Sequence, residues 1–130
     1  MATRKLEPKM VEYLDKKLNG NGLAEHAIAV KDARTLMLLA AQVCVGIREH
    51  GGNNRGPMVT LIQETVGGPD HVAWCMSAVQ TWIAYAEMRT GVMSPIFVSE
   101  HCMTVWRESP VAQRVLSLPL AGAIAIWRHG

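Results

Sequence analysis

The sequence contains few cysteines and little net charge. Its three cysteines, Cys44, Cys75 and Cys102, form an odd set without any Cys-x-x-Cys pair, so neither a disulfide framework nor a zinc ribbon is indicated. The net charge of +2 comes without a run of Lys and Arg interleaved with aromatic residues, which argues against a nucleic-acid partner. We therefore expect at least one free thiol, no metal site, no cofactor and no nucleic acid.

Long apolar runs are missing as well. The longest run, from Leu36 to Ile47, is too short to cross a bilayer, and the first residues lack the apolar segment of a signal peptide. We expect a protein without a membrane span that is cytoplasmic on synthesis. What the chain does contain is 49% apolar and 18% charged residues over 130 positions, a composition typical of one globular domain.

Helical periodicity dominates the apolar pattern. Apolar residues at helical spacing, with capping and breaking residues between them, predict helices over residues 6–18, 23–49 with a restart near Asp32, 57–64, 74–89 and 98–107. The segment around residues 36–41 should form the most buried helix. β-branched and aromatic alternation from Ala123 to Trp127 predicts a single strand. The expected fold class is mainly α, and α+β at most.

Cys75 is the residue whose position most favours chemistry. The pattern places it in the first turn of the helix over residues 74–89, after a glycine-rich loop. Unpaired N–H groups and the positive end of the helix dipole stabilise a thiolate there. The alternative is that Cys75 is a small buried hydrophobic residue, as most free cysteines are. For Cys44, which lies among Val43, Val45 and Ile47, core packing is the expected role.

Several motifs carry a resemblance when they are taken together in chain order. They are Asn53-Asn54-Arg55-Gly56-Pro57, a short helix, a glycine-containing loop, Trp74-Cys75 heading a helix with Trp82, and Pro119 with Gly122-Ala123-Ile124-Ala125-Ile126-Trp127. In this order they resemble the N-terminal half of a CHAP-type cysteine amidase/peptidase domain, over roughly residues 50 to 130. The resemblance implies a papain-like α+β fold, whose helical N-terminal half and one C-terminal strand would be present here, after an N-terminal helical extension over residues 1–49 that packs with it as one unit.

The resemblance also implies roles for individual residues. Cys75 would be the nucleophile that attacks an amide carbonyl as a thiolate, and main-chain N–H groups at Cys75 and its neighbours would hold the oxyanion. The Asn54 and Arg55 loop would lie near the substrate groove, where Arg55 fastens the loop and Asn54 is either structural or a substrate contact. Trp74 would wall the groove or belong to the core.

Two departures from the family pattern concern the catalytic partner. Ala123 stands where the family usually carries Asp, and the family's general base is a histidine on the next strand, beyond Gly130. Within the chain, His129 is the nearest stand-in, although it is expected to be a solvated turn residue. His71 precedes the nucleophile by four residues, which departs from the family order, and His101 lies on the helix over residues 98–107. His71 and Cys75, at four-residue spacing, could supply three zinc ligands together with His101 or Cys102, but no second close pair supports a zinc site and none is expected.

Two functional hypotheses follow from the resemblance. The first is a bacterial or phage-type peptidoglycan hydrolase, an amidase or endopeptidase, which is incomplete as given because the histidine lies past the end. Its partners would be peptidoglycan or its fragments, and the protein would be delivered to the cell envelope. The second is a non-catalytic helical module that binds the wall or a protein, with the strand from Ala123 to Trp127 pairing with another copy or a second fragment. An unrelated helical domain with a buried Cys75 is the third reading.

Overall fold

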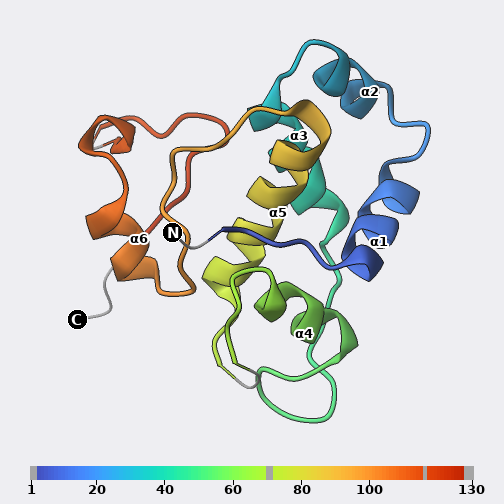
Figure 1. The fold of residues 1–130 in the computed structure, drawn as a ribbon, viewed down its shortest axis with the longest axis vertical. Helices are drawn as coiled ribbons and strands as arrows, with labels where there is room; N and C mark the ends of the chain where they lie inside the picture. Colours follow the sequence, from blue (N-terminus) through green and yellow to red (C-terminus); the bar gives the residue numbers. More distant parts are fainter. Residues whose placement is uncertain (1–2, 70–71, 116, 128–130) are drawn as a thin grey trace.

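The computed structural model describes residues 3–69, 72–115 and 117–127, and within these ranges the chain forms six α-helices and no strand (Figure 1). The predicted mainly α class is therefore confirmed. The helices are α1 (Pro8–Leu18), α2 (Gly22–Ala29), α3 (Ala33–Val43), α4 (Pro57–Glu64), α5 (Cys75–Thr90) and α6 (Cys102–Glu108), followed by a 3₁₀ turn, η1 (Val111–Gln113).

Helices α3 and α5 form the centre of the molecule and make its most extensive helix pairing. In Figure 1 they lie side by side, with α1 and α2 on one flank, α4 at one end of α5, and α6 on the opposite flank. Helices α1 and α2 pack against α3, and α4 contacts both α5 and α1. The first five helices therefore enclose one shared core.

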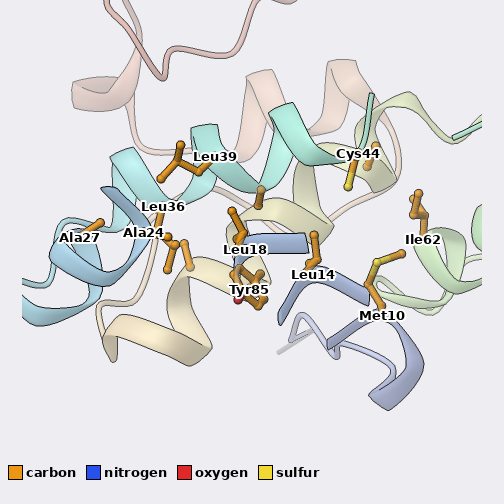
Figure 2. Close-up of a cluster of buried hydrophobic side chains, with 13 residues drawn as sticks. Met10, Leu14, Leu18, Ala24, Ala27, Leu36, Leu39, Cys44, Ile62 and Tyr85 are labelled. Carbon is orange, nitrogen blue, oxygen red and sulfur yellow. The ribbon is translucent and has the colours of Figure 1, made fainter. Parts of the chain in front are cut away.

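The core is built from apolar residues at helical spacing. Met10, Leu14 and Leu18 follow one another every four residues along α1 and are all buried, as expected for the inner stripe of an amphipathic helix. Figure 2 shows Leu14 and Leu18 near Tyr85 of α5, and Met10 on the side of Ile62 of α4. The predicted helix over residues 6–18 thus exists because its single apolar stripe has a partner surface.

Side-chain caps set the boundaries between the early helices. Asn21 accepts a hydrogen bond from the Ala24 N–H at 3.0 Å, and Asp32 accepts one from the Thr35 N–H at 3.1 Å, each satisfying a donor that a helix start leaves unpaired. The predicted restart at Asp32 is confirmed. The predicted extension of this helix to residue 49 is wrong, because α3 ends at Val43 and Gly46 adopts a left-handed φ of 103°.

The most buried helix is α5, not the helix around residues 36–41. Eleven residues of α5 are buried, against three in α3, although several of them are polar. Small side chains let neighbouring segments approach the helix closely. Three of the buried polar groups have a partner. The Thr81 hydroxyl donates to the Ser77 carbonyl at 2.8 Å, Thr90 donates to the Ala86 carbonyl at 2.7 Å, and Glu87 pairs with Arg4. Hydropathy alone therefore underestimates how deeply such a helix is buried.

Two polar clusters fix α5 to the N-terminal part of the chain. Arg4 donates to the carboxylate of Glu87 at 3.2 Å and to Gln80 Oε1 at 2.6 Å, and its side chain is only 4% exposed. In the second cluster, the Tyr85 hydroxyl donates to Asp15 of α1 at 2.7 Å, and Arg89 pairs with the same carboxylate. Charged residues are thus tolerated in and near the core because they are paired.

The C-terminal third is organised differently from its prediction. Helix α6 begins at Cys102, later than the predicted residue 98. The strand predicted from Ala123 to Trp127 does not form, since these residues have no regular secondary structure. Half-buried Ile124 and Ile126 still alternate with exposed neighbours, but a strand also requires a second strand to bond with, and the described residues provide none. The predicted pairing of two chains through this strand is therefore not supported by the structure.

Candidate functional site

Cys75 is the first residue of α5, and its side chain is exposed. The predicted helix start is confirmed, as is Gly91 past its end, which has a left-handed φ of 74° and donates to Glu87 O at 2.9 Å. The N–H groups of the first turn have no acceptor within the helix, so they are available near the thiol. An exposed thiol at a helix start can act as a nucleophile. The N–H donors beside it can stabilise negative charge on a substrate oxygen.

Trp74 belongs in part to the core, which is one of the two roles that the sequence left open. It is the N-cap residue of α5, its ring is half-buried against the apolar core, and its Nε1 donates to Glu49 Oε1 at 2.9 Å. The side chain therefore fixes the segment after α3 to the start of α5. It also directly precedes the exposed thiol of Cys75 in the sequence.

The loop with Asn54 and Arg55 is held by main-chain contacts. The Arg55 carbonyl accepts from the His50 N–H at 2.7 Å, which closes the loop, and Asn54 adopts a left-handed φ of 57°. Gly56, with a φ of 141°, precedes Pro57 at the start of α4, and an added Cβ would lie 3.1 Å from His50 N. The Arg55 side chain is exposed, so its backbone does the fastening.

Gln63 brings this loop to the segment before Cys75. Its side chain is buried, and Nε2 donates to the Asn54 carbonyl at 3.1 Å and to the Val72 carbonyl at 2.8 Å. One amide thus connects two loops that lie 18 residues apart along the chain. The sequence interpretation missed Gln63, and the only available signal was a polar residue among the apolar positions of α4.

Cys102 is the side chain that meets the Cys75 thiol. The two Sγ atoms lie 3.9 Å apart, one at the first residue of α5 and the other at the first residue of α6. Partial burial, and then the neighbouring Cys75, raise the pKa of Cys102 above its usual 9.0. This pairing was also missed, because the two residues are far apart in sequence and their meeting depends on the course of residues 91–101.

The described histidines do not contact the Cys75 thiol. His101 is exposed and lies 3.4 Å from its neighbour Glu100, measured from Nε2 to Oε1, and His26 and His50 are exposed residues of other segments. His71 and His129, named above as stand-ins for the base, lie outside the described residues. Over the described ranges, no group of three or more His, Cys, Asp or Glu side chains could hold a metal ion.

Two shallow hollows lie away from the thiol pair, beside α1 and the start of α4. The larger, of about 550 Å³, is lined among others by Lys9, Lys16 and Leu61, and the smaller, of about 400 Å³, by Lys17 and Arg48. Tyr13, Pro57 and Met58 line both. Cys75, whose side chain is exposed, lines neither of them.

Comparison with models of protein families, with curated proteins and with solved structures gives no match for this chain. In the part of the chain that the structure describes, every helix is too short or too polar to cross a membrane. The site must therefore be interpreted from its own geometry.

Proposed function

We propose that this protein is a peptidoglycan hydrolase of the cysteine amidase/endopeptidase type, with Cys75 as its nucleophile. The observation that carries the proposal is the exposed thiol at the first residue of α5. The loop with Asn54 supports it, because Gln63 connects that loop to the segment leading to the thiol. This arrangement is the one that the resemblance to CHAP-type domains implies for a nucleophile and its groove.

The reaction would proceed through an acyl-enzyme. The Cys75 thiolate attacks the carbonyl carbon of an amide, and the oxygen takes up the negative charge beside the first-turn N–H groups of α5. The C–N bond then breaks, the amine leaves with a proton from the general acid, and a thioester remains. Water, deprotonated by the same group, hydrolyses the thioester and restores the thiol.

The proposal requires a proton-transfer partner for Cys75. In the CHAP-type pattern this is a histidine that follows residue 130, and within the chain His129 is the candidate nearest to that place. These two candidates for the base can be distinguished by replacing each histidine in turn, in protein expressed from the longest available reading frame. If release falls when a downstream histidine is replaced and persists in His129→Ala, the base lies downstream, and the reverse result assigns it to His129.

The decisive test compares Cys75→Ala with the unmodified protein on insoluble peptidoglycan. We expect release of soluble fragments to fall by a factor on the order of 10³ or more, since the nucleophile is lost. New free amino groups should appear without new reducing sugar ends, because an amide and not a glycosidic bond is cut. Cys102→Ser is the matched control, an exchange of the neighbouring thiol that should leave release intact. Equal release by Cys75→Ala and the unmodified protein would refute the catalytic role.

A second candidate is a non-catalytic module that binds the cell wall or a protein. The observation in its favour is the exposed apolar side chains of the C-terminal third, where Val111 is 72% and Leu118 79% exposed. Such a module would cosediment with insoluble peptidoglycan or a partner without releasing any fragment. Cosedimentation that is unchanged in Cys75→Ala, together with absent release, would favour this candidate over the hydrolase.

A further inference from the structure

We propose that Cys75 and Cys102 form a two-thiol redox site, in which a peroxide converts the pair into a reversible intramolecular disulfide. The proposal rests on the placement of the two thiols and does not depend on the hydrolase activity. If Cys75 is the nucleophile, the disulfide would also switch it off.

The two sulfur atoms lie close to bonding distance. The Sγ atoms lie 3.9 Å apart, whereas the sulfurs of a disulfide lie about 2.05 Å apart. Closing the remaining gap requires a small shift of one helix start. No other residue has to be displaced from between the two sulfurs, because the thiols are already in hydrogen-bond contact.

Helix α6 makes few buried contacts with the rest of the protein. Among its residues only Val105 is fully buried, and residues 91–101, which lead to it, contain no helix or strand. Cys75 belongs to the most buried helix of the molecule. We therefore expect Cys102 to move toward Cys75 when the bond forms, at little cost to the core.

Both thiols of the pair are accessible from solvent. Cys75 is exposed, and Cys102 is partly exposed, so a small oxidant can reach the pair. Cys44 provides an internal contrast, because it is buried in the core among α1, α3 and Ile62, and burial raises the pKa of its thiol. Because a buried thiol is shielded from a dissolved oxidant, Cys44 should remain reduced.

The chemistry balances with a peroxide as the only oxidant. The Cys75 thiolate attacks one peroxide oxygen, the O–O bond breaks, and a sulfenic acid forms. The leaving hydroxide, or the alkoxide of an organic peroxide, takes up the proton that the Cys75 thiol released on ionising and departs as water or an alcohol. The Cys102 thiolate then attacks that sulfur, the S–O bond breaks, and hydroxide leaves as water after taking up a proton. With hydrogen peroxide, two thiols and one peroxide give one disulfide and two waters. A dithiol reductant reverses the change.

The test is to treat the purified chain with a few equivalents of hydrogen peroxide and then count thiols after denaturation. We expect the count to fall from three to one, the product to remain monomeric on a non-reducing gel, and peptide mapping to join Cys75 to Cys102. A dithiol should restore all three thiols. Cys44→Ala should still lose two thiols, and Cys102→Ser should lose only that of Cys75, without an internal bond.

Three results would overturn the proposal. They are an unchanged thiol count in the unmodified protein, a bond that includes Cys44, and a bond between two chains. All three are measured on the protein itself, so they are distinct from a failure of the hydrolase proposal. Where hydrolysis is observed, peroxide should inhibit it reversibly, and in Cys102→Ser the inhibition should resist the dithiol because unresolved Cys75 oxidises further.

Discussion

Residues 3–90 and residues 91–127 are held by different kinds of contact. The first region contains the shared apolar core of α1 to α5. In the described part of the second region, only Val105 and Ser109 are buried, and eight large apolar side chains are exposed. Those eight are Val92, Met93, Phe97, Val111, Val115, Leu118, Leu120 and Trp127.

The second region is attached mainly through hydrogen bonds to its backbone. Gln80 donates to the carbonyls of Phe97 at 2.8 Å and Ser99 at 3.2 Å, and Glu87 accepts from the Ser94 N–H at 2.8 Å. Buried polar side chains of α5 thus position a segment that has almost no core of its own. The thiol pair lies on this boundary, with one cysteine on the well-packed helix and the other on the lightly held one.

The largest expected effect comes from breaking the polar junction between the regions. Arg4 binds Glu87 and Gln80 on α5 and also donates to the Ile96 carbonyl. Arg4→Met leaves the buried Glu87 carboxylate without its ion pair, which should cost about 3–5 kcal/mol of unfolding free energy. Urea unfolding measures this loss. Arg107→Met replaces an exposed arginine of α6 and should stay within about 0.5 kcal/mol; similar losses in the two variants would contradict the assignment.

A matched pair of leucines tests the difference in packing directly. Leu36 is fully buried between helices, whereas Leu118 is 79% exposed. Leu36→Ala should lower the free energy of unfolding by about 2–5 kcal/mol, because it leaves a cavity in the core. Leu118→Ala should change it by no more than about 0.5 kcal/mol. Comparable effects of the two substitutions in thermal or urea unfolding would show that residues 117–127 are packed more tightly than the exposure of Leu118 indicates.

The smallest effect concerns alkaline stability of the core. Burial, and then the Asp15 carboxylate, raise the pKa of Tyr85 from 10.0 to about 12. The folded state therefore holds this proton more tightly than the unfolded chain, so the stabilisation is complete below pH 10 and is lost as pH rises toward 12. The loss should be roughly 2–3 kcal/mol.

Unfolding free energies measured at pH 9 and pH 11.5 check this expectation. Tyr85→Phe should be less stable at pH 9, since it lacks the hydrogen bond to Asp15, and its further decline up to pH 11.5 should be shallower. Tyr13→Phe, at the half-buried tyrosine of α1, serves as the control and should decline almost as steeply as the unmodified protein. The same slope in all three proteins would remove Tyr85 as the source.

Local signals predicted most of the helix starts and ends. The Asp32 side chain caps the start of α3, and Gly91 ends α5 through its left-handed backbone. Pro57 suits the first position of α4, where a backbone N–H is not needed. These features depend on residues a few positions apart. The prediction of a C-terminal strand was wrong because a strand depends on distant residues. Alternation from Ala123 to Trp127 specifies a strand only where another strand is available to pair with it.

The candidate site was predictable only in part. Its central residue, Cys75, follows from the sequence because a helix start is a local feature. Gln63 and Cys102 do not, because their roles depend on contacts with Val72 and with Cys75 that arise after the chain has turned back on itself. Sequence alone therefore determined where most helices begin and that Cys75 stands at the start of one. The tertiary structure decided that α5 is the buried centre and that this thiol faces another thiol, because long-range packing, and not local preference, brings such groups together.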